Sequence, residues 1–269
     1  MAFNSEIGQI GMKLTNQQIQ QFNEEGYIII SELFSAKEVE KLKGEISGIF
    51  AQRREENVRE NDGDTVRTAF AAHTYNDVYS RFVCHPKILE PAEQLLEGQV
   101  YVHQFKLNAK AAFNGDVWQW HQDFGIWHRD DEMPIPQAMN LAVYLDDVTE
   151  FNGPLYLLPR SHKHGVLEAG HDTTTTSYPL WTLDDTKIRE LTEEGGIVAP
   201  KGPAGTGFFF HSCLVHASPP NISPWDRLIV YVSYNNVKNH IRRFKRPEWM
   251  AHRDFTPLEL ELEGCLLSS

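Results

Sequence analysis

The chain has 269 residues, 41% of them hydrophobic, which is enough for one mainly β domain with a substantial core. Its formal net charge of -12 argues against a nucleic-acid partner, because phosphate backbones bind to basic surfaces. Three cysteines without short paired spacing indicate no disulfide framework. Residues 1–13 lack a signal-peptide pattern, and no apolar run is long enough to span a bilayer. We therefore expect a cytoplasmic protein without a membrane partner.

The first hundred residues are predicted to be mainly helical. Capping-box patterns begin at Thr15 and Ser35, and apolar residues at helical spacing follow each of them, to about Gly26 and Phe50. A short β-rich run at 27–30 separates these helices, 53–65 is charged and loop-like, and another helix is predicted for 88–96. We interpret residues 1–99 as the helical support of a single domain that spans 1–269.

From residue 100 onward, short β-rich runs alternate with turn residues. The runs are 100–107, 137–145, 154–158, 207–211 and 228–235. Helices followed by many short strands predict a mainly β fold, with a jelly-roll core of the cupin-like double-stranded β-helix type in 100–240. The polar stretch at about 168–194 is too long for a hairpin loop and is interpreted as a lid-like insertion. Residues 241–269 form a C-terminal extension.

Two segments carry side chains suited to binding a metal ion. The segment WQWHQDFGIWH (118–128) contains His121 and Asp123, which on a strand would project from the same face. His216 lies in a later segment, FFFHSCLVHASPPNISPWDR (208–227). Two imidazoles and one carboxylate leave coordination positions open, as in the non-haem Fe(II) oxygenases that bind a 2-oxo acid and dioxygen. Large apolar side chains surround His121 and Asp123 in the sequence, as expected of an oxidising site that excludes water. They are Trp118, Trp120, Phe124 and Trp127.

The position of Arg227, in the same segment as His216, favours His216 as the third metal ligand. An arginine at the head of an apolar strand is costly to bury unless it meets an anion. The distal carboxylate of 2-oxoglutarate would supply that anion through a two-pronged, charge-assisted pairing. The alternative is a surface ion pair with Asp226 or another carboxylate. Other histidines compete as third ligands but lack an arginine at this spacing: His103, His128 and His211.

Several motifs resemble a known family. HQFKLNAK (103–110), WHQDFGIWHRDDEMP (120–134) and NGPLYLLPRSH (152–162) are similar to blocks of the ectoine hydroxylases, within the phytanoyl-CoA dioxygenase superfamily of Fe(II)/2-oxoglutarate oxygenases. Through VHQFKLN, WHQDF, DVTEFNGP, HASPPNISP and RDFTPL, the chain looks still closer to bacterial free L-leucine 5-hydroxylases. The resemblance covers nearly the whole chain, and the motifs are specific in combination.

The resemblance implies roles for individual residues. It makes His121, Asp123 and His216 the ligands of Fe(II). It also makes Arg227 the anchor of 2-oxoglutarate, with O2 as the second co-substrate. Further contacts to 2-oxoglutarate are implied for Asn108 and Lys110, two polar residues at the end of the first strand of the core.

Positions that face the organic substrate are also implied. Gln104 and Trp127 match such positions in ectoine hydroxylases. Lys106 stands where those enzymes have an arginine, and Gly125-Ile126 replaces a polar pair, which shifts the expected substrate from ectoine toward an aliphatic side chain. For the carboxylate of that substrate, the candidates are Gln104, Lys106 and Arg67, although Arg67 also fits a plain surface charge.

These observations predict an enzyme that hydroxylates an unactivated C–H bond of a free aliphatic L-amino acid. L-Leucine, attacked at its δ-carbon, is the first choice, with 2-oxoglutarate converted to succinate and CO2. Two alternatives stay open. One is the same chemistry on another small zwitterion or on a carrier-bound amino acid, and the other is a non-catalytic cupin-type binding protein. The sequence indicates no oligomeric state.

Overall fold

The computed structural model describes residues 12–268. The segment 1–11, which contains most of the stretch predicted to lack a signal peptide, lies outside the described residues. No described helix combines the length and the apolar character needed to cross a membrane.

Helices gather at the N-terminal end of the chain, where the capping boxes at Thr15 and Ser35 are confirmed. The helix predicted up to Phe50 is divided in two at Glu45. The α-helices are α1 (Asn16–Glu25), α2 (Ala36–Gly44), α3 (Ile46–Phe50), α4 (Asp77–Val83), α5 (Pro86–Leu95), α6 (Asp123–Asp131) and α7 (Asp185–Gly195).

The described strands form two main antiparallel sheets and a small ribbon. They are β1 (Tyr27–Ile30), β2 (Asn57–Arg59), β3 (Val66–Phe70), β4 (Val100–Lys110), β5 (Trp118–His121), β6 (Ala138–Tyr144), β7 (Tyr156–Leu157), β8 (Gly170–Asp172), β9 (Leu180–Thr182), β10 (Gly207–His211), β11 (His216–Ser218) and β12 (Arg227–Asn236). The larger sheet has the order β1-β10-β6-β12-β4-β3-β2, the smaller one β5-β11-β7, and β8 pairs only with β9. This arrangement confirms the mainly β, double-stranded β-helix core.

The N-terminal hundred residues are not only a helical support. Strands β1, β2 and β3 come from this region and extend both edges of the larger sheet, β1 beside β10 and β3 beside β4. The predicted loop 53–65 contains β2. A strand of three to five residues depends on backbone partners far away in the chain, so its local sequence carries little signal.

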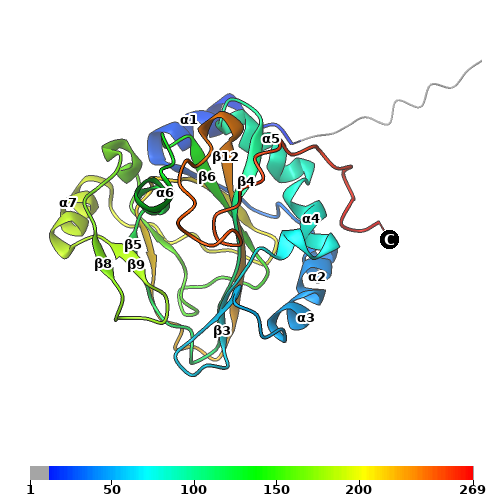
Figure 1. Cartoon of the computed structure of the whole chain (residues 1–269), viewed down its shortest axis with the longest axis horizontal. Coiled ribbons are helices and arrows are strands. Elements are labelled where there is room, and N and C mark those ends of the chain that lie inside the picture. The colour runs from blue at the N-terminus through cyan, green and yellow to red at the C-terminus, as the bar shows by residue number, and fades with distance from the viewer. Residues whose placement is uncertain (1–11, 269) are drawn as a thin grey trace, which may run out of the picture.

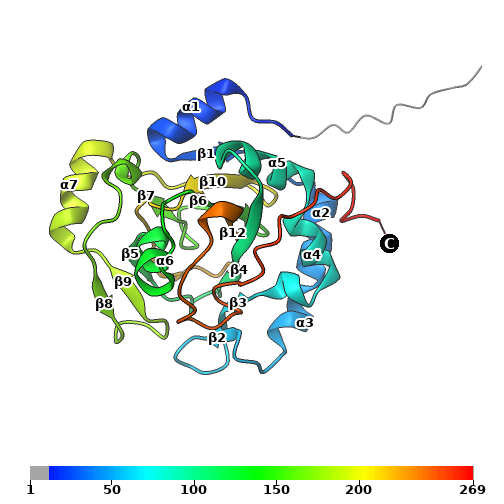
Figure 2. The same cartoon turned by 45° about the horizontal axis from the view of Figure 1, so that its top comes forward.

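The larger sheet separates two apolar cores. Helices α2 to α5 cover one of its faces, whereas β5, β8, β9 and α7 lie on the other side (Figures 1 and 2). Alternate residues of β6 and β12 therefore point to different cores. Residues between the two sheets include Phe208, Phe210, Ile229 and Tyr231, and the candidate site lies beside this second core.

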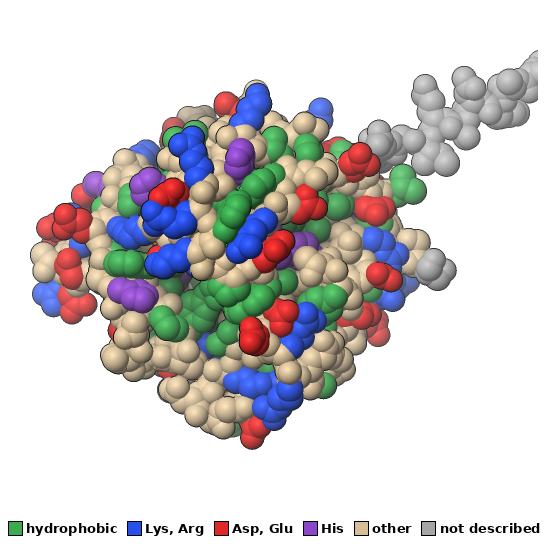
Figure 3. All heavy atoms as spheres, viewed as in Figure 1, with side chains coloured by type: hydrophobic (Ala, Val, Ile, Leu, Met, Phe, Trp, Pro, Cys, Tyr) green, Lys and Arg blue, Asp and Glu red, His purple; other side chains and the backbone are tan. Residues whose placement is uncertain are grey.

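The surface drawn in Figure 3 mixes charges of both signs with apolar side chains. On this face, Lys and Arg side chains lie among Asp, Glu and His side chains and apolar ones.

Candidate active site

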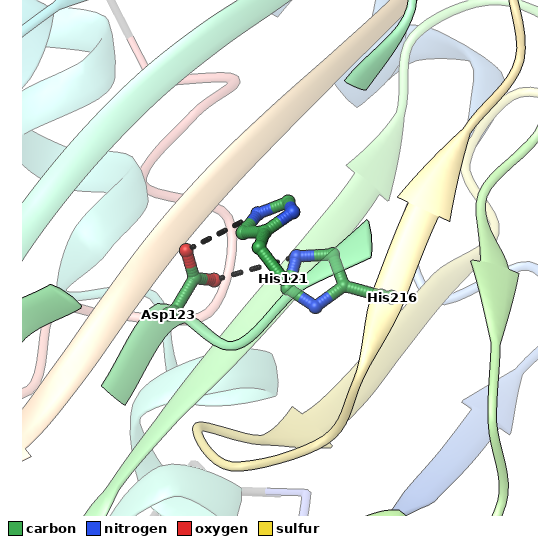
Figure 4. Close-up of side chains that lie close together, drawn as sticks. All are labelled: His121, Asp123 and His216. Carbon is green, nitrogen blue, oxygen red and sulfur yellow. Dashed lines mark ion pairs between the residues drawn. The ribbon is translucent and has the colours of Figure 1, made fainter. Parts of the chain in front are cut away.

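Three side chains predicted as metal ligands converge between the sheets (Figure 4). His121 ends β5 and His216 begins β11, and the two residues are directly paired in the antiparallel ladder. Asp123 is the first residue of α6, so the expectation that it shares a strand with His121 is wrong. Gln122 is the N-cap of α6, and the start of this helix places the carboxylate beside the imidazoles. Asp123 Oδ1 lies 3.8 Å from His121 Nε2, and Oδ2 lies 3.6 Å from His216 Nε2.

Hydrogen bonds orient both imidazoles for coordination. His121 Nδ1 lies 2.6 Å from the Gln119 carbonyl oxygen, and His216 Nδ1 lies 2.9 Å from that of Leu214. Because a carbonyl only accepts, each Nδ1 carries the hydrogen and each Nε2 presents its lone pair toward Asp123. Burial, aided by the charge of His216, lowers the pKa of His121 to about 3. Burial also lowers the pKa of His216. Neutral imidazoles are the form that binds metal.

The carboxylate of Asp123 is kept ionised despite its burial. Burial alone would raise its pKa, but Lys106, His216 and His121 together lower it to about 2. Asn140 Nδ2 donates to Asp123 Oδ2 over 2.8 Å, and Ser233 Oγ donates to Asn140 Oδ1 over 2.5 Å. This chain of hydrogen bonds holds one carboxylate oxygen in a defined orientation.

Asn140→Ala tests that orientation. We expect the affinity for Fe(II) to fall by about 10- to 100-fold, as is typical when the hydrogen-bond partner of a metal ligand is removed. Metal titration of the purified variant measures the change. Gln52→Ala, at an exposed position, is the control and should bind as the wild type does. An unchanged affinity in Asn140→Ala would mean that this hydrogen bond does not orient the ligand.

Arg227 is buried beside this cluster without a counter-charge. Its side chain is 1% exposed, and no carboxylate within residues 12–268 forms an ion pair with it. Nη1 donates to the Gly153 carbonyl over 2.8 Å and lies 3.4 Å from Ser218 Oγ, while the buried Nε has no hydrogen-bond partner. The alternative of an ion pair with Asp226 is wrong, since that carboxylate accepts from the Ala112 amide. A buried guanidinium without its anion is suited to an anionic ligand.

The two further residues implied for 2-oxoglutarate differ in position. Asn108 lines the cleft at the metal cluster, and its Oδ1 accepts from Thr68 Oγ1 over 2.7 Å. Lys110 does not line the cleft. Its Nζ donates to the carbonyls of Asp116 and Pro219 over 2.5 and 2.6 Å. Burial, with the charge of Arg227, lowers the pKa of Lys110 to about 6. In this structure Lys110 is therefore committed to the backbone, and contact with 2-oxoglutarate would require it to move.

A cleft opens at the metal cluster, and its wall combines charged, polar and apolar side chains. Gln104, Lys106 and Trp127 line it, as expected of substrate-facing residues. Gln104 Nε2 donates to the Met250 carbonyl over 2.7 Å, which leaves its Oε1 as an acceptor. Lys106 Nζ lies 3.9 Å from Asp123 Oδ1, and burial lowers its pKa.

Arg67 has neither of its expected roles. It is 1% exposed rather than a surface charge, and it lies outside the cleft lining. Its guanidinium pairs with Glu60 at 3.0 Å, donates to the Val117 carbonyl over 2.6 Å and stacks 4.0 Å from the Trp118 ring. We conclude that Arg67 supports Trp118 from behind, and Trp118 forms part of the cleft wall.

The structure places some of the remaining aromatic candidates in the cleft wall, and the other aromatic and histidine candidates elsewhere. Trp118 and Trp127 line the cleft, whereas Trp120 packs against the apolar cluster under the 168–194 insertion and Phe124 against the core of α6. Within residues 12–268, the metal-binding group contains none of the rival histidines, His103, His128 and His211.

Several cleft residues were not predicted from the sequence. Tyr178 and Leu180 come from the 168–194 insertion, which contains β8, β9 and most of α7, and Arg246 comes from the C-terminal extension. Arg246 Nε lies 3.0 and 2.9 Å from the two oxygens of Asp131, so the carboxylate of α6 positions the guanidinium in the cleft wall. In the basic run RRFKR (242–246), no local signal distinguishes Arg246 from its exposed neighbours.

Comparisons with known proteins agree with this geometry. A profile of the phytanoyl-CoA dioxygenase family matches residues 22–229. The chain is 36% identical to an L-proline trans-4-hydroxylase of Streptomyces griseoviridis over 88% of its own length and 92% of that protein. It is 34% identical to an ectoine dioxygenase of Bordetella parapertussis, over 91% and 85%. A crystal structure of EctD from S. alaskensis with 2-oxoglutarate and 5-hydroxyectoine superposes with a TM-score of 0.82 at 31% identity, covering 92% of this chain and 87% of that one.

The double-stranded β-helix, the His-Asp-His cluster and the unpaired arginine together define an Fe(II)/2-oxoglutarate-dependent dioxygenase. The chain belongs to the phytanoyl-CoA dioxygenase family. Fe(II) is its metal, and 2-oxoglutarate and O2 are its co-substrates. The likeness to leucine hydroxylases in particular stays a prediction.

The residues present fit this metal and co-substrate. His121, Asp123 and His216 would hold Fe(II) through two Nε2 atoms and a carboxylate oxygen, and Arg227 offers the unpaired buried cation for an oxo acid. When bound, iron and 2-oxoglutarate supply the oxidising chemistry, and the protein supplies positioning and exclusion of water.

Proposed function

We propose that this dioxygenase hydroxylates an unactivated C–H bond of a free aliphatic L-amino acid, with L-leucine at the δ-carbon as the first candidate. The relatives named above act, by their names, on proline and on ectoine, which are likewise small molecules. The observation that carries the proposal is the composition of the cleft wall, which combines cationic with apolar side chains.

The cationic part suits a free carboxylate. Lys106 and Arg246 both line the cleft with the metal ligands, and Arg246 Nη1 makes no hydrogen bond to any residue from 12 to 268. The Lys106 ammonium and the Arg246 Nη1 group are therefore donors that face one cavity, and such donors favour an anion through charge-assisted hydrogen bonds. A carrier-bound amino acid has a thioester in place of this carboxylate, so the cleft favours the free acid.

The apolar part suits an aliphatic side chain. Ile126, Leu155 and Leu180 line the same cleft, and Trp127 adds a ring that is 1% exposed. Burying these surfaces against a branched side chain is favourable by roughly 25 cal/mol per Å² of apolar area. With the carboxylate held at one end of the substrate, this contact determines which carbon lies near the metal.

A panel of free amino acids tests the proposal. Succinate formation and product mass would be measured with L-leucine, other aliphatic amino acids, L-proline and ectoine, each with Fe(II), 2-oxoglutarate and O2. We expect L-leucine to give a product heavier by one oxygen atom, with kcat/KM at least about 10-fold above that of substrates differing by one methylene, as hydrophobic pockets commonly achieve. A preference for ectoine, or succinate release without an oxygenated amino acid, would contradict the proposal.

A further inference from the structure

We propose that the cleft recognises the carboxylate of its substrate and not the ammonium group, so that the protein also hydroxylates the 2-hydroxy acid counterparts of its amino acids. This inference rests on the proposed function for the aliphatic part of the substrate. It adds a second substrate class, aliphatic 2-hydroxy acids.

The first argument is a balance of charges in the cleft. Among its described lining residues the cations are Lys106, Arg227 and Arg246, and the only carboxylate is Asp123. When bound, Fe(II) would be neutralised by Asp123 together with one carboxylate of 2-oxoglutarate. The other carboxylate would neutralise Arg227.

Two cations of the lining then remain. Arg246 is neutralised by Asp131, which is fully buried behind it. Lys106 has only Asp123 near it, at 3.9 Å, and that carboxylate is already counted with the metal. One positive charge is therefore left over. A monoanionic acid cancels it, whereas a zwitterion brings an additional cation into the same cleft and leaves this charge uncompensated.

The second argument concerns acceptors. A buried ammonium group needs an anionic partner to offset its loss of water. Gln104 lines the cleft, and because its Nε2 donates to the Met250 carbonyl, its Oε1 is an acceptor available to the α-substituent. An amide oxygen can accept from a hydroxyl as well as from an ammonium group, but it carries no charge that would offset the ammonium. A 2-hydroxyl group thus satisfies Gln104 without adding charge.

The reaction needs no new reagent. One oxygen atom of O2 enters the C–H bond of the 2-hydroxy acid and the other enters succinate. Oxidative loss of CO2 from 2-oxoglutarate supplies two electrons, and the C–H bond supplies the other two. The hydroxylated acid, succinate and CO2 are the products.

Paired substrates test the inference. Each amino acid of the panel would be run beside its 2-hydroxy acid, for example L-leucine beside (S)-2-hydroxy-4-methylpentanoic acid, with L-leucinamide as the analogue that lacks the carboxylate. We expect the hydroxy acid to retain kcat/KM within about 10-fold of the amino acid, and the amide to lose roughly 100-fold or more, as when one partner of a buried charge pair is removed. Dissociation constants measured without O2, through the fluorescence of the cleft tryptophans, should follow the same order.

The outcomes separate this inference from the proposed function. If an amino acid is hydroxylated and kcat/KM for its hydroxy acid is lower by more than about 10-fold, the inference is overturned and the proposed function stands. Turnover of hydroxy acids alone overturns the proposed function and supports the inference. No product from either member of any pair overturns both.

Gln104→Glu provides a second test within the protein. It places a carboxylate where an ammonium group would meet it, so the ratio of kcat/KM for amino acid over hydroxy acid should rise by about 10-fold or more. Gln52→Glu, at an exposed position, is the matched control and should leave the ratio unchanged. Thermal unfolding shows whether both variants fold. A folded Gln104→Glu variant with an unchanged ratio would contradict the assignment of Gln104 as the acceptor.

Discussion

Asp123→Ala should abolish coupled turnover. The carboxylate is the only anion of the metal-binding group, and both its oxygens face the imidazoles at 3.6 and 3.8 Å. Loss of a hydrogen-bond partner of a metal ligand commonly costs 10- to 100-fold in affinity or activity, and loss of the ligand itself should exceed that, so we expect at least about a 100-fold fall in product formation. Product per succinate, together with iron bound per protein, measures the effect.

Asp185→Ala is the matched control for this variant. Asp185 is exposed in the first turn of α7, and the same change there should leave iron binding and turnover intact. Thermal unfolding without metal shows that the Asp123 variant folds. Retained hydroxylation in folded Asp123→Ala would disprove the assignment of this residue as a ligand.

Arg227→Ala should raise the concentration of 2-oxoglutarate needed for turnover by about 100-fold or more. Removing one partner of a buried charge pair typically costs 2–5 kcal/mol, and about 3 kcal/mol corresponds to that factor. The site has the features this estimate requires, namely a guanidinium that is 1% exposed and lacks an anion in the described protein. KM for 2-oxoglutarate is the direct measurement.

The effect should be specific to the co-substrate. Iron affinity and the dissociation constant of the amino-acid substrate should change little, because Arg227 is not one of the metal ligands. Arg189→Ala, on the surface of α7, is the control. An unchanged KM for 2-oxoglutarate in Arg227→Ala would point to another anchor. Lys110 would then be the first candidate, and it would have to give up its hydrogen bonds to backbone carbonyls to reach the co-substrate.

Much of the metal site could be predicted because its chemistry is encoded in residue types. Few side chains bind Fe(II), and an arginine at the head of an apolar strand requires an anion, so His121, Asp123, His216 and Arg227 are distinguishable in the printed sequence. The backbone around Asp123 was predicted wrongly. A His-x-Asp pattern has the same spacing on a strand as across a turn into a helix, and the hydrogen bonds that decide between them involve Ser212, far along the chain.

The substrate side of the cleft was less predictable. Arg67 and Arg246 are both buried or half-buried cations, yet only Arg246 faces the cavity. The difference arises from their carboxylate partners, Glu60 for the first and Asp131 for the second. Nothing local to either arginine specifies which carboxylate it meets.

The sequence by itself determined the local structure and the chemistry: two capped helices, the main strands of the core, the metal-ligand set and the need for an anion at Arg227. Those features depend on side-chain type and on spacings of a few residues. Only the tertiary structure decided that β1, β2 and β3 complete the larger sheet. It also decided that Tyr178 and Arg246 line the same cleft as Gln104. Such contacts join segments tens to more than a hundred residues apart, and their stability comes from mutual burial and pairing, which no short stretch of the chain contains.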